Sequence, residues 1–272
     1  MQRPPRSLRS VVSLCGSVLC SGIALPLLAA EPGPFCIVLP DQKVLPGQED
    51  VWFPVLFTNE EPLQAFQLMG VHDPALLTLD GVETRFTSLP GDPEVFVVNE
   101  FEGRFEIGIV FDFEAPFTGT TFPAGGARRA LNLIFDVSAT APPGTVTSVD
   151  LVNDQALSPI MNIFTVDGES ILPCLKGSTV TIVGGNPPLF VRGDANSDGQ
   201  IDLSDAVRTL NFLFVGGERP PCLDAADFSD RGEVDISSAV ATLNFLFLGG
   251  PEPAVPFPNS GLDPTEDGLP CP

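Results

Sequence analysis

The feature that most restricts the fold of this chain is a tandem repeat in its C-terminal third. The hexapeptide TLNFLF occupies residues 209–214 and again residues 242–247, and Gly-Gly follows one residue after each copy. An acidic stretch precedes each copy, and these stretches begin at Asp194 and Asp227, so both features recur after 33 residues. Such self-similarity at a fixed spacing indicates the duplication of one supersecondary unit. We therefore expect two copies of a loop followed by a helix.

The first acidic stretch, DANSDGQIDLSD at residues 194–205, has the pattern of a twelve-residue calcium loop. Oxygen-bearing side chains fall at loop positions 1, 3, 5, 9 and 12, glycine at position 6 permits a sharp turn, and position 7 offers its backbone carbonyl. Aspartate stands at position 12, where the usual pattern has glutamate. The sequence therefore predicts one Ca²⁺ site. Its predicted ligands are Asp194, Asn196, Asp198, Gln200, Asp202 and Asp205.

The second acidic stretch, residues 227–238, keeps the outline of the first but loses part of its ligand set. Serine stands at positions 3 and 12, and Arg231 stands at position 5. We expect Arg231 to pair with Asp227 and Asp235 and so to take the place of the ion. The alternative is a weak site that uses Asp230 out of register. The oxygen-bearing residues left at coordinating positions of this degenerate loop are Asp227, Ser229, Glu233 and Asp235.

The helix that follows the first loop carries an apolar stripe. Val207, Leu210, Leu213 and Phe214 recur at helical spacing, which is typical of a helix face that packs against a core. We expect these four side chains to be buried.

Residues 35–183 read as an all-β module. Apolar residues alternate in RFEIGIVF (104–111) and in ALNLIFDV (130–137), which predicts strands with one buried face. VWFPVLFT (51–58) and STVTIV (178–183) are further predicted strands, and Pro54 indicates an edge position or a bulge in the former. Turn-forming clusters separate these strands. The pattern predicts a mainly β sandwich followed by a small α module.

The first 30 residues have arginines followed by an apolar run that ends in small residues, which is typical of a secretory signal peptide. A retained membrane anchor is the competing interpretation, but serines and a proline interrupt the run. We expect export, no membrane span after cleavage, and an extracellular or cell-surface location in a bacterium. The predicted organisation is a signal peptide at 1–30, a sandwich at 31–184, a linker at 185–190 and a calcium-binding repeat module at 191–272.

Four cysteines remain outside the predicted signal peptide. In an oxidising compartment they allow two disulfides with three possible connectivities. The domain layout favours Cys36–Cys174 and Cys222–Cys271, because each pair brackets one module.

The formal net charge is −22. A polyanion of this kind is repelled by nucleic acid and by anionic lipid surfaces, so neither is an expected partner. It is suited to holding divalent cations or to meeting a basic partner.

A duplicated loop and helix without a helix before the loop resembles the type I dockerin, in particular the variants of planctomycete-like secreted proteins whose helix ends in LNFLFLGG. The resemblance covers about residues 189–272. It implies that loop positions 10 and 11 of each repeat help to form a partner surface. In this chain those positions are Leu203, Ser204, Ile236 and Ser237.

The β module resembles a cohesin or a related carbohydrate-binding sandwich. The resemblance rests on the order of VLPGQEDVWFPVLFTN, VHDPALLTLDGV, RALNLIFDV and the closing DGESILPCLKGSTVTI. It implies a partner of the dockerin class, and the dockerin-like module implies a cohesin-like partner on another chain or on the same protein.

Two functions are compatible with these patterns. The first is a non-catalytic secreted docking or scaffold protein whose C-terminal module is ordered by calcium. The second is a carbohydrate-binding or glycoside-hydrolase-associated component of polysaccharide breakdown, with a polysaccharide ligand. The chain has one Trp, no Tyr and a single histidine, and it lacks the GxSxG and HExxH motifs. We therefore expect no enzyme activity and propose no catalytic residue.

Overall fold

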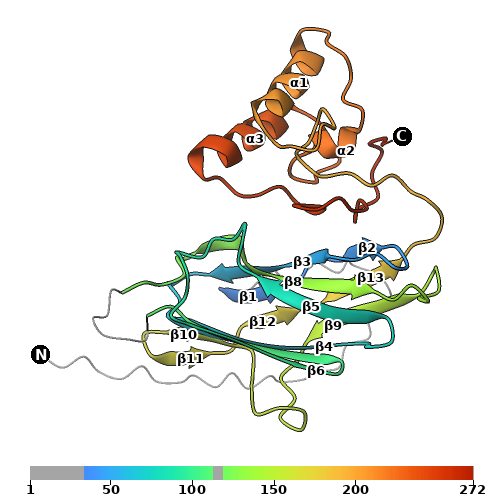
Figure 1. Cartoon of the computed structure of the whole chain (residues 1–272). Helices are drawn as coiled ribbons and strands as arrows, with labels where there is room; N and C mark the ends of the chain where they lie inside the picture. Colours follow the sequence, from blue (N-terminus) through green and yellow to red (C-terminus); the bar gives the residue numbers. More distant parts are fainter. Residues whose placement is uncertain (1–33, 113–118, 272) are drawn as a thin grey trace, which may run out of the picture. The chain divides into compact units, whose positions relative to one another are not determined.

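The computed structural model describes residues 34–112 and 119–271, so the predicted signal peptide lies outside the described residues. Strands occupy the first part of this range and helices the last part (Figure 1). The strands are β1 (Phe35–Val38), β2 (Gln42–Val44), β3 (Val51–Asn59), β4 (Ala65–His72), β5 (Leu77–Glu83), β6 (Val95–Phe101), β7 (Arg104–Val110), β8 (Gly125–Val137), β9 (Val146–Leu151), β10 (Ile163–Val166), β11 (Glu169–Ile171), β12 (Cys174–Lys176) and β13 (Ser178–Ile182). The helices are α1 (Leu203–Phe214), α2 (Leu223–Ala226) and α3 (Ile236–Leu248).

The strands form two sheets. One has the order β12-β1-β3-β8-β5. The other has the order β11-β10-β4-β9-β13-β2, with β7 pairing with β4 and β6 pairing with β7. Most pairs are antiparallel, but β1 with β12 and β13 with β2 are parallel. The chain is therefore mainly β, as the sequence predicts.

The core lies between the two sheets. Phe57 of the first sheet packs edge-on against Phe66 of the second, with ring centroids 4.8 Å apart, and its ring centroid lies 4.7 Å from that of Phe164. The alternating residues predicted from 104–111 and 130–137 all face this core and are at most 4% exposed. Period-2 alternation therefore identified the buried face of β7 and of β8 correctly.

Pro54 lies in the interior of β3, opposite Asn132 of β8. The strand β1 pairs with β3 only through residues 56–59, so among the described strands Pro54 is bordered by β8 alone. A register shift follows it between Val55 and Leu56. Both features suit a residue that has no backbone N–H to donate, and they explain the edge or bulge that the sequence predicts.

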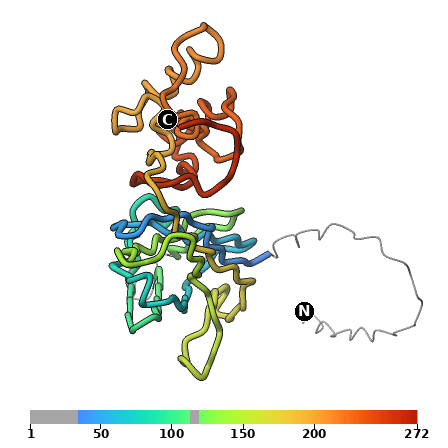
Figure 2. The backbone as a smooth tube through the Cα atoms, turned by 90° about the vertical axis from the view of Figure 1, so that its right-hand side faces the viewer, coloured from blue at the N-terminus to red at the C-terminus, as the bar shows by residue number. Residues whose placement is uncertain are grey.

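Two disulfides join the predicted cysteine pairs. Cys36 of β1 is bonded to Cys174 of β12, and Cys222 is bonded to Cys271. The first crosslink joins two strands that already pair in register. The second attaches the end of the described chain to the start of α2. Figure 2 shows the red C-terminal part of the backbone beside the orange segments of the helical module.

The helices α1 and α3 contact each other (Figure 1). Asp202 caps the start of α1 and Asp235 caps the start of α3, each through a capping box. Among the described residues, none of the helices has the length and apolar character that a membrane crossing needs.

Candidate functional site

The first repeat loop folds around the side chain of Asp194, which is 6% exposed. Its Oδ1 accepts a hydrogen bond from the backbone N–H of Asp198 at 3.1 Å, and its Oδ2 accepts one from Gly199 at 2.9 Å. Gly199 has a φ of +86°, a backbone conformation that favours glycine and permits the sharp turn expected at loop position 6. The turn therefore directs successive N–H groups at the first carboxylate of the loop.

The other end of the loop is organised by Asp205, which is 1% exposed. Its Oδ1 accepts from the backbone N–H of Asn196 at 3.1 Å and its Oδ2 from that of Asp202 at 2.9 Å. The side chain of Asp202 accepts in turn from the N–H of Ser204 at the start of α1. The last predicted ligand thus holds the beginning of the loop against the beginning of the helix.

The loop concentrates negative charge. The pKa of Asp205 is raised to about 6, mainly by burial and also by the carboxylates of Asp194 and Asp198, while the backbone N–H groups of Asp202 and Asn196 lower it. A cation among these carboxylates would relieve both the burial cost and the repulsion. The atoms that these residues offer to a metal are all oxygens, and oxygen is the ligand atom that Ca²⁺ takes. The residues present therefore fit calcium.

The remaining predicted ligands are placed as follows. Asn196 donates through Nδ2 to Asp198 Oδ2 at 2.9 Å and to Ser204 Oγ at 2.7 Å. Asp198 Oδ1 accepts from the N–H of Gln200 at 3.0 Å. The structure thus joins Asp194, Asn196, Asp198 and Asp205 in one network. Asp198, Gln200 and Asp202 are exposed.

The second loop repeats the backbone of the first with a different charge pattern. Asp227 Oδ2 accepts from the N–H groups of Arg231 and Gly232 at 2.6 and 2.7 Å, as Asp194 does from the matching residues of the first loop. The guanidinium of Arg231 lies 3.3 Å from Asp235 and also bonds to Ser237. The pairing of Arg231 with Asp235 is confirmed. A side-chain pairing of Arg231 with Asp227 was wrong, because Asp227 receives only the backbone N–H.

A different arginine, Arg192, is the buried cation of this region. Its side chain is fully buried, and its Nη2 lies 2.8 Å from Asp263 and 3.0 Å from Asp230. The same guanidinium donates to the backbone carbonyls of Val255, Asp224 and Asp227. Sequence reasoning missed Arg192. The available signal was an arginine two residues before the first loop, in a region from 191 to 272 that has four arginines and no lysine.

The predicted helix core was wrong, because none of its four residues is fully buried. Val207 and Phe214 are exposed, and Leu210 and Leu213 are half-buried. The buried side chains of α1 are Asp205, Ala206 and Thr209, and those of α3 are the matching residues of the second repeat, Ser238, Ala239 and Thr242. The buried side of each helix therefore carries short side chains, and the larger apolar side chains are exposed or half-buried.

Several apolar side chains of α1 and α3 are exposed at matching positions of the two repeats, 33 residues apart. Val207 and Val240 are each 45% exposed, and Phe214 and Phe247 are each 64% exposed. The full set, which we call the helix face, is Leu203, Val207, Phe214 and Val215 with Ile236, Val240, Phe247 and Leu248. The residues of α3 include no charged side chain. Leu203, Val207 and Phe247 of this set lie together, and grouped exposed apolar side chains are typical of interaction sites on soluble proteins.

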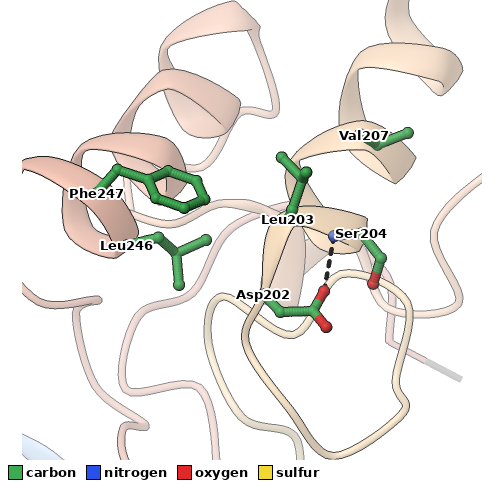
Figure 3. A pocket seen from close by; sticks show the side chains of 6 residues that line it. All are labelled: Asp202, Leu203, Ser204, Val207, Leu246 and Phe247. Carbon is green, nitrogen blue, oxygen red and sulfur yellow. Dashed lines mark hydrogen bonds between the residues drawn. The ribbon is translucent and has the colours of Figure 1, made fainter.

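A groove crosses the helix face. It is lined by Asp202, Leu203, Ser204 and Val207 of the first repeat and by Leu246 and Phe247 of α3 (Figure 3). Of the residues predicted to bind a partner, Leu203 and Ile236 belong to the helix face. Ser204 and Ser237 are bonded to their own loops, to Asn196 and to Arg231 respectively.

The close helix contact gives a first testable expectation. Ala206 lies on the buried side of α1 and is 1% exposed. A larger side chain there would be overpacked, so Ala206→Leu should lower the free energy of unfolding of the helical module by about 1–3 kcal/mol. The exposed neighbour Val207→Leu should change it by less than about 0.5 kcal/mol. Hydrogen exchange of residues 190–271 measures both changes, and equal effects of the two substitutions would contradict the packing described.

No family model matches the chain, and no curated protein matches its sequence. Among solved structures, the chain is similar to the third cohesin ScaC of Acetivibrio cellulolyticus in complex with the ScaB dockerin, at 16% identity and a TM-score of 0.45, over 55% of this chain and 99% of that one.

Two further similarities are of the same kind. A Coh-OlpA–Doc918 cohesin–dockerin complex from Clostridium thermocellum has 15% identity and a TM-score of 0.45, over 56% of this chain and all of that one. A non-cellulosomal cohesin from the archaeon Archaeoglobus fulgidus has 18% identity and a TM-score of 0.42, over 56% of this chain and 93% of that one. All three TM-scores are below 0.5, so no function is transferred from these structures.

Proposed function

We propose that the chain is a non-catalytic docking protein, exported to the cell surface or beyond, which binds a protein partner through the helix face. The observation that carries this proposal is the repeat-related exposure of four apolar pairs on α1, on the residue that follows it, and on α3. Burying two exposed phenylalanines and their neighbours against a partner would supply the hydrophobic free energy of association.

Calcium in the first loop has a defined part in this function. Asp194 and Asp205 would hold the ion, together with the oxygens of Asn196 and Asp198, and Asp202 both belongs to the loop and caps α1. Neutralising the loop would fix the start of α1, where Leu203 lies. Calcium would therefore order the helix face without contacting the partner.

The partner we propose is the cohesin-like sandwich of a second copy of the chain, which gives head-to-tail association. The sandwich exposes Phe96, Val97 and Phe101 on β6. Among the described strands, β6 pairs only with β7 and so lies at an edge of its sheet. An exposed apolar edge strand is a ready surface for another chain.

Sedimentation of the purified protein tests this proposal. With calcium we expect concentration-dependent oligomers, and with EDTA a monomer. Because every copy is strongly acidic, association should strengthen as salt screens the repulsion. The substitution Phe247→Asp should weaken association by about 30-fold or more, the effect of losing a contact worth about 2 kcal/mol.

The matched control for this substitution is Leu172→Asp, at a site on the sandwich that is 61% exposed. It should leave association unchanged. A monomer under all conditions would contradict docking to a second copy. Equal weakening by Phe247→Asp and Leu172→Asp would contradict the helix face as the binding surface.

The polysaccharide-binding alternative has less support from the residues present. Trp52 is only 8% exposed, so the one tryptophan of the chain offers little ring surface for a sugar. A glycan array on the same protein tests this function directly.

A further inference from the structure

Five carboxylates gather beside the second repeat in an arrangement that the loop pattern does not predict. One ligand oxygen each from Asp224, Asp263 and Asp267 lies within 4.8 Å of the others, and Asp227, Asp230 and Asp267 form a second such group. Oxygens bound to one Ca²⁺ at about 2.3–2.6 Å lie no farther apart than about 5 Å. Both groups are therefore compact enough for their oxygens to share an ion, and Asp267 belongs to both.

Two of these carboxylates are buried and only partly satisfied. Asp224 is 5% exposed and Asp227 is fully buried. Among the described residues, the Oδ1 atom of each has no hydrogen-bond partner. A buried carboxylate oxygen without a partner is costly, because burial removes its hydration.

The neighbouring arginine does not satisfy these two oxygens. The N–H groups of Arg192 are directed to three backbone carbonyls and to Asp230 and Asp263. The guanidinium therefore contacts two of the five carboxylates, and the cluster has five acidic side chains for this one cation. Burial, with Asp263 and Asp267 adding to it, raises the pKa of Asp224 to about 7.

We propose that this cluster is a second Ca²⁺ site, built from α2, the second loop and the C-terminal segment. Its ligands are carboxylate oxygens of Asp224, Asp227, Asp230, Asp263 and Asp267. The site differs from the predicted second loop, because Ser229, Glu233 and Asp235 take no part in it. Arg192 supplies one positive charge at its rim and the ion supplies the other two.

The C-terminal segment is held in place for this role. Asp267 packs against Gly232, where an added Cβ would lie 3.2 Å from the Cβ of Asp267. The N–H of Leu223 donates to the carbonyl of Pro270, and Cys271 is bonded to Cys222. The sulfurs near Asp224 are joined in this disulfide, so carboxylates alone are left as ligands.

Equilibrium dialysis of the metal-stripped full chain against calcium near neutral pH tests the site. We expect the wild-type protein to bind two ions, one in the first loop and one in the cluster. Asp267→Asn should remove one equivalent or weaken it about tenfold or more, because calcium affinity follows the number of charged ligands. Asp194→Asn should remove the other equivalent, and the double variant should bind none.

The control is Glu266→Gln, which removes the same charge from the adjacent exposed residue and should still bind two ions. Circular dichroism of each variant checks that it is folded, and the exposed position of Asp267 makes its substitution mild. One ion in the wild type that Asp194→Asn removes and Asp267→Asn does not would overturn the second site. Two ions bound to Asp267→Asn with the affinities of the wild type would also overturn it. A single ion that depends on Asp267 alone would support the second site and contradict calcium in the first loop.

Discussion

The Arg192→Met protein is expected to lose about 3–5 kcal/mol of stability in its C-terminal module, because removing one member of a buried ion pair leaves the other charge uncompensated. Asp230 and Asp263 would lose their cation, and three backbone carbonyls would lose their donor. Hydrogen exchange of peptides from residues 190–271 should become about 10²- to 4 × 10³-fold faster, since each 1.4 kcal/mol corresponds to about tenfold. Peptides of the β module should be unaffected and serve as an internal reference.

Arg208→Met is the matched control for this prediction. Arg208 lies on α1 and pairs at 3.3 Å with Glu218, whose side chain is 86% exposed. A surface pair of this kind contributes no more than about 1 kcal/mol. If Arg192→Met were as mild as Arg208→Met, the buried network would not hold the module together.

Calcium is expected to protect the first loop and α1 from hydrogen exchange. At about 100 times the dissociation constant, an ion that binds only the folded module stabilises it by about 2.7 kcal/mol. Asp205→Asn should abolish this protection in peptides from residues 194–214, because Asp205 joins the two ends of the loop. The measurement compares EDTA with calcium for the same peptides.

Glu218→Gln is the control, since Glu218 lies in the same module and outside both loops. It should respond to calcium as the wild type does. Protection that is the same in EDTA and in calcium would show that the first loop is held by its own hydrogen bonds and does not need the ion.

The buried faces of two strands of the sandwich could be predicted, because the alternation of apolar residues along a strand indicates which side chains are buried. In a strand, alternate side chains point to opposite sides, so the apolar positions of 104–111 and 130–137 had to share one face. The cysteine pairing followed from the order of the modules, and it is the pairing in the structure. The pairing order of the thirteen described strands could not be obtained in this way, because it depends on contacts between distant segments.

The helix stripe was mispredicted for a physical reason. Helical spacing identifies an apolar face, but it does not show whether anything covers that face. In α1 the covered side is formed by Ala206 and Thr209, and the larger Val207 and Phe214 are outside. An apolar face that the fold leaves uncovered is also what a docking function needs.

The acidic cluster and Arg192 were beyond the reach of a loop pattern. Arg192 bonds to the carbonyl of Asp224, 32 residues away, and to the side chain of Asp263, 71 residues away. Asp263 and Asp267 belong to neither repeat. The C-terminal segment reaches α2 only in the folded chain. The spacing of residues within one loop therefore could not predict the acidic cluster.

The crosslink between β1 and β12 has a mechanical consequence. Cys36 and Cys174 are 138 residues apart in the chain, and the bond joins them near the two ends of the β module. A pulling force that enters at β1 and leaves after β13 passes through this bond and bypasses the chain between the two cysteines. At about 3.3–3.6 Å per residue, roughly 450–500 Å of contour length is withheld from extension. Under tension the oxidised β module would therefore act as a short, nearly inextensible segment. The withheld contour length would become available only after a reductant cleaves the disulfide.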